Sequence, residues 1–167
     1  MNNFYKDKVI IVTGASSGIG LASATRFASL GAKIVLAARS IDKLEKIAEE
    51  INEKFNKSTD NVLCVKTDVT KEEDCKNLVE QTVKHFGKID VLVNNAGISM
   101  RAVFKDMDLN VMRSLMDTNF WGTVYCTKYA LPYLLESKGS VVGVISTAGY
   151  VGLPARTAYS ASKFAVR

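Results

Sequence analysis

The chain has 167 residues, of which 47% are hydrophobic and 23% are charged, and its net charge is +5 at pH 7. This length and composition indicate one soluble globular domain with a core of its own and exclude a disordered chain. The basic residues are interspersed with acidic ones, as in residues 42–46, so no basic face for nucleic acid is predicted.

Neither a membrane segment nor a metal site is expected. No run approaches the roughly 18 apolar residues of a membrane-spanning helix, and residues 1–8 lack the apolar stretch of a secretory signal. Cys64, Cys75 and Cys126 are widely spaced and odd in number, which is typical of reduced thiols in a cytoplasmic protein. The single histidine, His85, stands at a predicted helix end and forms no metal-ligand pattern with them.

Hydrophobic periodicity predicts strands and helices that alternate along the whole chain. A short β-branched run leads into the glycine-rich residues 13–20, and apolar residues then recur at helical spacing until Gly31. Thr70-Lys71-Glu72-Glu73 matches a capping box and predicts a helix start. The predicted strands are residues 8–12, 34–38, 62–67, 89–93 and 140–145, and the predicted helices are residues 18–30, 41–55, 70–86 and 110–135, with a last one from about residue 158.

This alternation implies parallel strands joined by right-handed crossovers. We therefore predict one α/β domain over residues 1–167, built on a doubly wound, Rossmann-like parallel sheet with helices on both faces. We expect the strand order 3-2-1-4-5. The fifth strand would then have an unpaired outer edge, which natural proteins normally protect.

A strand, a glycine-rich turn and a helix, in that order, predict a pyrophosphate-binding loop at residues 13–20. Backbone N–H groups and the positive end of the helix dipole suit a phosphate there. Gly14, Gly18 and Gly20 make the turn with the spacing Gly-x-x-x-Gly-x-Gly, which differs from the common Gly-x-Gly-x-x-Gly. The simpler alternative is that these glycines only turn the loop.

About twenty residues further on, NAD-binding folds usually place an acidic residue for the ribose 2′-hydroxyl. Here residues 37–40 read Ala-Ala-Arg-Ser, and Arg39 offers a planar set of donors for a 2′-phosphate. We therefore expect NADP(H) as the cofactor in preference to NAD(H). Asp68 ends the third predicted strand, where an aspartate serves either as an adenine contact or as a capping residue.

Tyr159 and Lys163 are four residues apart, which places them about 6 Å apart along one face of a helix. The ammonium group favours the phenolate form, so the tyrosine can exchange a proton with an alcohol or carbonyl oxygen. Such a pair also arises by chance in a chain with 6 tyrosines. It indicates catalysis only in combination with the other motifs.

Five motifs in this order resemble the short-chain dehydrogenase/reductase family: residues 13–20, Asn94-Asn95-Ala96-Gly97, Asn119, Ser146, and Tyr159 with Lys163. In that family the tyrosine is the acid/base and the lysine holds the nicotinamide ribose. The serine polarises the substrate oxygen, and the asparagine orders a water that leads protons to the lysine.

The resemblance implies hydride transfer between NADP(H) and a carbonyl or secondary alcohol, with Asn119, Ser146, Tyr159 and Lys163 as the catalytic residues. It further implies a homodimer or homotetramer, and a C-terminal part, with further strands and a substrate lid, that is missing after Arg167. The implied cofactor contacts are Gly14, Ser16, Ser17, Gly18, Ile19, Gly20, Arg39, Asp68, Val69, Asn95, Ala96, Gly97, Tyr159 and Lys163.

The expected substrate is a hydrophobic ketone, because the pocket wall that can be assigned is mostly apolar. A 3-oxoacyl-thioester reductase remains an alternative, since Arg101 or Arg156 can bind the phosphopantetheine of an acyl carrier protein. A non-catalytic nucleotide-binding or scaffold protein is the alternative of another class. The assigned wall is Ser99, Met100, Arg101, Tyr150, Val151, Leu153 and Pro154.

Overall fold

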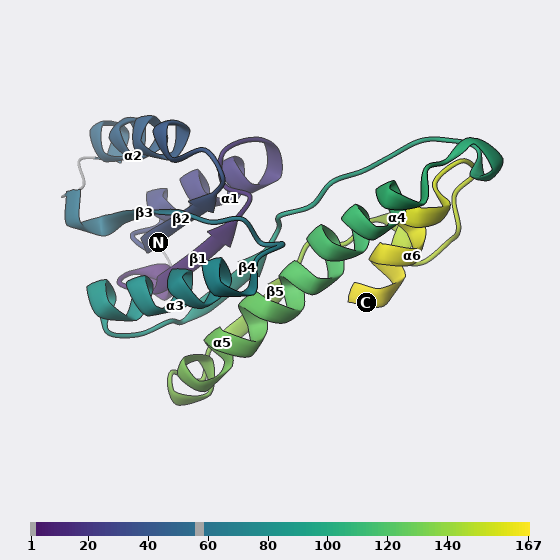
Figure 1. The fold of residues 1–167 in the computed structure, drawn as a ribbon. Coiled ribbons are helices and arrows are strands. Elements are labelled where there is room, and N and C mark those ends of the chain that lie inside the picture. The colour runs from purple at the N-terminus through teal and green to yellow at the C-terminus, as the bar shows by residue number, and fades with distance from the viewer. Residues whose placement is uncertain (1–2, 56–58) are drawn as a thin grey trace.

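Five parallel strands form the sheet of the computed structural model, which describes residues 3–55 and 59–167 (Figure 1). Their order is β3-β2-β1-β4-β5, which confirms the predicted topology. The strands are β1 (Val9–Thr13), β2 (Lys33–Ala38), β3 (Val62–Lys66), β4 (Val91–Asn94) and β5 (Ser140–Gly143). The α-helices are α1 (Gly18–Ser29), α2 (Ile41–Phe55), α3 (Glu72–Phe86), α4 (Leu109–Leu115), α5 (Gly122–Glu136) and α6 (Thr157–Val166).

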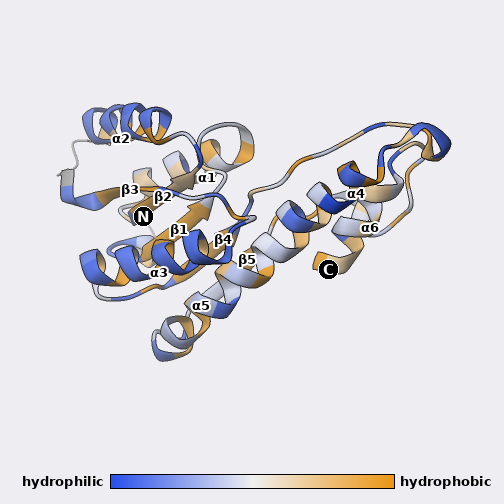
Figure 2. Ribbon diagram, in the orientation of Figure 1, coloured by the Kyte–Doolittle hydropathy of each residue, from blue (hydrophilic) through white to orange (hydrophobic). Residues whose placement is uncertain are grey.

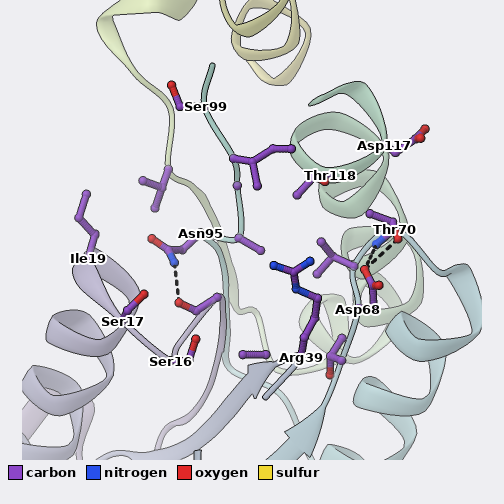
Figure 3. A pocket seen from close by; sticks show the side chains of 18 of the residues that line it. Ser16, Ser17, Ile19, Arg39, Asp68, Thr70, Asn95, Ser99, Asp117 and Thr118 are labelled. Carbon is purple, nitrogen blue, oxygen red and sulfur yellow. Dashed lines mark hydrogen bonds between the residues drawn. The ribbon is translucent and has the colours of Figure 1, made fainter. Parts of the chain in front are cut away.

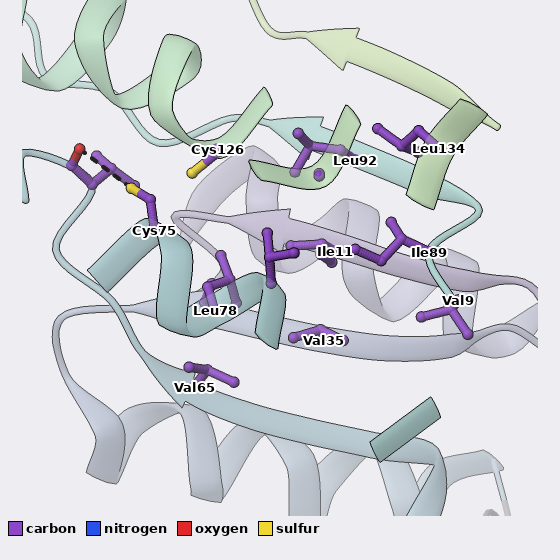
Figure 4. Packing of buried hydrophobic residues seen from close by; sticks show 14 residues of the cluster. Val9, Ile11, Val35, Val65, Cys75, Leu78, Ile89, Leu92, Cys126 and Leu134 are labelled. Atoms are coloured by element: carbon purple, nitrogen blue, oxygen red, sulfur yellow. Dashed lines mark hydrogen bonds between the residues drawn. The ribbon is translucent and has the colours of Figure 1, made fainter. Parts of the chain in front are cut away.

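Helices cover both faces of the sheet, as Figure 1 shows, so the central strands are buried throughout. Successive residues of a strand point to opposite faces. Ile10 and Ile34 therefore pack beneath α1 and α2, whereas Ile11 and Val35 pack beneath α3 and α5 (Figure 4). Figure 2 shows the resulting pattern, with apolar strands inside and hydrophilic outer faces on α2 and α3. The continuous apolar runs of the sequence are thus explained by burial on two sides.

Asp90 joins the amino ends of β1 and β4. Its side chain is only 4% exposed and accepts hydrogen bonds of 2.9 Å from Val9 N, Lys8 Nζ and Lys88 Nζ. Burial alone would raise the pKa of this carboxyl, but the lysines and the Val9 amide outweigh it and hold the pKa below its ordinary value. β1 begins one residue later than predicted, and the Lys8 side chain is drawn to Asp90.

The predicted capping box at residues 70–73 is wrong. α3 begins at Glu72, with Lys71 as its N-cap, and no side chain caps it there. The Thr70 hydroxyl instead donates to Asp68 Oδ1 at 2.8 Å, because this carboxylate lies close and is the stronger acceptor. Gly87 ends the helix in the left-handed conformation, as its position predicted.

The helix predicted for residues 110–135 is divided into three parts. A π-helix, η4 (Met116–Trp121), separates α4 from α5. π-helical turns inside longer helices often occur at functional sites. This one contains Asn119, which is 1% exposed. The apolar pattern of the sequence continues across the π-helix, and for this reason the pattern predicts a single helix.

β5 forms the outer edge of the described sheet and pairs with β4 alone. It ends at Gly143, two residues earlier than predicted, and all four of its residues are exposed. The expected edge strand is therefore confirmed, with Val141 and Val142 exposed on it.

Among the residues that the structure describes, no helix is both long and apolar enough to span a bilayer.

The three cysteines are free thiols inside or near the core. Cys75 on α3 and Cys126 on α5 are buried where these helices face each other (Figure 4). The Cys75 thiol and burial raise the pKa of Cys126 well above its usual range. Burial, with a smaller effect from Glu45, raises the pKa of Cys64 to about 11.

Candidate active site

A pocket of about 940 Å³ opens at the carboxyl ends of the central strands (Figure 3). This is the edge of a doubly wound sheet where ligands usually bind. The pocket brings together loops that follow β1, β2, β3, β4 and β5, together with one face of α6. Its lining includes Gly14, Ser16, Ser17, Ile19, Arg39, Asp68, Val69, Asn95, Ala96, Gly97, Ser99, Ser146, Tyr159 and Lys163.

The loop after β1 is shaped by close packing of its backbone. Gly14 has φ +65°, and a β-carbon there would lie 2.9 Å from Ala96 Cα. A β-carbon on Gly20 would overlap Gly14 O and Asn95 Nδ2. The Ser17 side chain makes no capping hydrogen bond, so the first turn of α1 keeps free N–H groups beside the pocket. The loop thus presents the uncapped N-terminus of α1 to the pocket, a feature that suits an anion.

Thr13 connects this loop to the segment after β4. Its hydroxyl oxygen accepts hydrogen bonds of 3.0 Å from both Asn95 N and Ala96 N. The hydroxyl itself donates to Val93 O at 3.3 Å. Asn95 Nδ2 in turn donates to Thr13 O at 2.8 Å. The two walls of the pocket are therefore fixed to each other before any ligand binds.

Arg39 points into the pocket from the end of β2, with Asp68 opposite it at the end of β3 (Figure 3). Partial burial works to raise the pKa of Asp68. Hydrogen bonds from Thr70 and the charges of Arg39 and Lys71 outweigh this effect and lower the pKa. Asp68 is therefore an ionised acceptor, and Arg39 remains an exposed cation on the pocket wall.

Ser146, Tyr159 and Lys163 meet at the other end of the pocket. Ser146 caps the short helix η5 (Thr147–Gly149) and accepts a 3.2 Å hydrogen bond from Ala148 N. Lys163 Nζ lies 6.0 Å from the centre of the Tyr159 ring and donates to Val144 O at 2.9 Å. The lysine is 7% exposed, and burial lowers its pKa.

Asn119 lies behind this group and does not line the pocket. Its Oδ1 accepts from Ile98 N at 2.8 Å, and its Nδ2 donates to Ile98 O at 3.0 Å and to Ser162 Oγ at 2.9 Å. Ser162 Oγ donates onward to Tyr159 O at 2.8 Å. The side chain thus joins η4, the segment after β4 and α6 behind Tyr159 and Lys163.

The structure brings nearly all predicted site residues to one pocket. Gly18 and Gly20, in the first turn of α1, are not part of its lining. Asn119, in η4, is not part of it either. Sequence reasoning gave no role to Thr13 or to Ser162. A threonine that ends a buried strand and a serine next to Lys163 were the available signals.

The short chain dehydrogenase family matches residues 8–167, so the chain belongs to this family. It is 43% identical to 11-beta-hydroxysteroid dehydrogenase 1A of Arabidopsis thaliana over 160 residues, which are 95% of this chain and 45% of that protein. It is 41% identical to a dehydrogenase/reductase SDR family protein 7-like of Dictyostelium discoideum, over 97% of this chain and 52% of that one. The chain spans about half the length of these curated relatives.

Solved structures agree with this assignment. An alcohol dehydrogenase from Thermococcus sibiricus complexed with 5-hydroxy-NADP has a TM-score of 0.91 and 30% identity, over 96% of this chain and 67% of that one. A short chain dehydrogenase/reductase from Burkholderia phymatum in complex with NAD also has a TM-score of 0.91 and 30% identity, over 99% of this chain and 58% of that one. The fold and the nicotinamide-cofactor family are therefore established together.

Proposed function

We propose that the protein is an oxidoreductase that interconverts a hydrophobic ketone and its secondary alcohol with NADP(H). The observation that carries this proposal is that one pocket is lined both by the loop at the N-terminus of α1 and by Ser146, Tyr159 and Lys163. Such a pocket can hold an extended dinucleotide with its reactive end beside the proton-transfer residues.

The residues of the pocket fit a nicotinamide dinucleotide. The N-terminus of α1 and the tightly packed Gly14 loop would hold the pyrophosphate. Arg39 would bind a 2′-phosphate, whereas no carboxylate follows it on the strand end to favour the free ribose of NAD(H). When bound, the cofactor supplies or accepts a hydride at the substrate carbon.

Tyr159 would hold and move the proton at the substrate oxygen. Lys163, held against Val144 O, places a cation near the phenol ring, and so favours a proton leaving the hydroxyl during ketone reduction. Ser146 would donate a hydrogen bond to the same oxygen as charge develops on it. Asn119 keeps Ile98 and α6 in place behind Tyr159 and Lys163.

A bulky hydrophobic ketone fits the region beside the catalytic residues better than the alternatives. Tyr150 and Val151 are 56% and 61% exposed there, and the Arabidopsis relative is named a hydroxysteroid dehydrogenase. For the acyl-carrier alternative, Arg156 Nη1 is already bonded to Ser99 Oγ at 2.6 Å, which leaves the exposed Arg101 as the arginine for a phosphopantetheine. The scaffold alternative has no use for a lysine held inside at the cost of desolvation.

Helix α5 exposes an aromatic and apolar surface that supports a homodimer or homotetramer. Trp121, the last residue of η4, stacks on Tyr125 of α5 with ring centres 5.7 Å apart, and Trp121 remains 44% exposed. Leu131 and Leu135, further along the helix, are 44% and 70% exposed. Light scattering coupled to size exclusion measures the assembly size directly.

Cofactor titration tests the NADP(H) assignment. NADPH should bind at least about tenfold more tightly than NADH, equivalent to about 1.4 kcal/mol. Arg39→Asp should reverse this order, since a carboxylate repels the 2′-phosphate and accepts a hydrogen bond from a ribose hydroxyl. Arg26→Asp, on the exposed side of α1, is the matched control and should keep the preference. A wild type that prefers NADH would contradict the assignment.

Tyr159→Phe tests the proton transfer. In the full chain, kcat for ketone reduction should fall by about 10² or more, the usual effect of losing a general acid, while NADPH affinity stays the same. Tyr133→Phe, on the far part of α5, should leave both quantities unchanged. Near wild-type turnover by the Tyr159 variant would rule out the acid/base role.

A further inference from the structure

Arg156 connects two segments that are far apart in the chain. It is the last residue before α6, and its Nη1 lies 2.6 Å from Ser99 Oγ and 3.5 Å from Met100 O. Beside it, Ala102 N donates to Ala155 O at 3.0 Å. The segment after β4 and the loop before α6 are therefore joined at one point, at the substrate end of the pocket.

The same guanidinium contacts the catalytic tyrosine. Arg156 Cζ lies 5.8 Å from the centre of the Tyr159 ring, and Lys163 Nζ lies 6.0 Å from it. Residues three positions before and four positions after a helical residue lie on its side of the helix, one turn away in each direction. The ring thus has two cations near it, of which Lys163 is bonded to Val144 O and Arg156 to the Ser99–Met100 segment.

The backbone is unfavourable where this arrangement begins. Ala155 has φ +57°, a left-handed conformation that residues with a β-carbon rarely adopt. The unfavourable conformation is retained while the contacts around it hold, namely the Ala102 bond and the two hydrogen bonds of Arg156. Ala155 thus fixes the backbone at the residue before Arg156, and the side chain of Arg156 is held by its bonds to Ser99 and Met100.

We propose that Arg156 is a positioning residue for ketone reduction, which holds the Tyr159 ring and the Ser99–Met100 wall of the substrate region in one fixed arrangement. The inference rests on the proposed function and names a residue that sets how the ketone lies against Tyr159. An arginine suits this position because its planar fork can stack on a ring and donate to two acceptors at once. An ammonium group can replace only part of these contacts.

Steady-state kinetics of Arg156→Met and Arg156→Lys in the full chain test the proposal, with NADPH and a hydrophobic ketone. For the methionine variant, kcat should fall about tenfold and KM for the ketone should rise, since small misplacements of reacting groups have effects of this size. The NADPH dissociation constant should stay within about twofold, because Arg156 lies outside the cofactor end of the pocket. The lysine variant should recover part of the lost kcat.

A matched control and a second substitution separate positioning from folding. Arg113→Met removes an exposed arginine of α4 that donates to Asn110 of the same helix, and it should keep wild-type kinetics. Ser99→Ala should lower kcat by a smaller factor, and adding it to Arg156→Met should cause no further loss, because both remove the same contact.

Wild-type kcat and KM in Arg156→Met would overturn the inference while leaving the proposed function intact. An equal loss of NADPH affinity and ketone turnover would also overturn it, because that pattern indicates general loss of structure. A wild type that turns over no ketone with NADPH would overturn both proposals.

Discussion

Replacing Asp90 should measure how much its contacts between β1 and β4 contribute to the free energy of unfolding. Asp90→Asn keeps an oxygen for Val9 N but loses the negative charge that two lysines contact at 2.9 Å. These lysine side chains are 38% and 46% exposed and can turn to solvent, so the free energy of unfolding should fall by only about 1–2 kcal/mol. Asp90→Ala also leaves the buried Val9 N–H without a partner and should cost about 3–4 kcal/mol.

Urea unfolding at several pH values provides the assay. The folded pKa of Asp90 lies below the unfolded one, so its stabilisation is present above the unfolded value and is lost as the pH falls through the folded value. The gap between wild type and Asp90→Asn should therefore stay constant from about pH 7 to 5 and close below 3.8, the ordinary value for this carboxyl. An alanine variant as stable as the asparagine variant would refute the role given to Val9 N, and a gap that persists in acid would refute the role of charge.

Two further predictions concern Thr13 and Cys64. Thr13→Val keeps the shape of the side chain but leaves Asn95 N and Ala96 N without their acceptor. The free energy of unfolding measured in urea should therefore fall by about 2–4 kcal/mol, and NADPH should bind more weakly. Unchanged stability would show that water replaces the hydroxyl. Because the pKa of Cys64 is about 11 instead of 9.0, its thiolate fraction at pH 8 should be about a hundredfold lower than that of a free thiol. A disulfide reagent should therefore modify Cys64 slowly until urea is added. Rapid labelling of the native protein would contradict this prediction.

The sheet could be predicted because its apolar runs are short, continuous and separated by glycine or helical spacing. Ile10 to Val12 and residues 34–38 are buried on two sides, and only a doubly covered parallel sheet explains such runs. The pairing of Tyr159 with Lys163 follows equally from helix geometry. The place of Ser146 needed the family resemblance, since one serine after a strand carries little information alone.

The partners of Asn119 could not be predicted from the chain. Its contact with Ser162 spans 43 residues and depends on how α6 packs against η4. The π-helix itself leaves no mark on the hydrophobic pattern, so periodicity indicates one unbroken helix. The expected capping box at Thr70 failed for a related reason, because Asp68 accepts from both the amide and the hydroxyl of Thr70 and holds this residue in the turn before the helix. Local sequence patterns therefore predict the helices and strands, whereas the tertiary packing determines which polar side chains bond to each other.

The π-helix also makes the length of this segment critical. Cys126 and Ala130 hold α5 against the sheet, and Gly122 lies so close to Val69 that a β-carbon would be 2.8 Å from its Cγ2. A π-helical turn closes i→i+5 hydrogen bonds and so takes up more residues per turn than an α-helix. Deleting one residue of Met116–Trp121 would therefore favour closure as an ordinary α-helix over a rotation of α4 against α5. Asn119 lies inside this segment and reaches Ile98 from it, so the length of the segment bears on the site more directly than on the flanking helices.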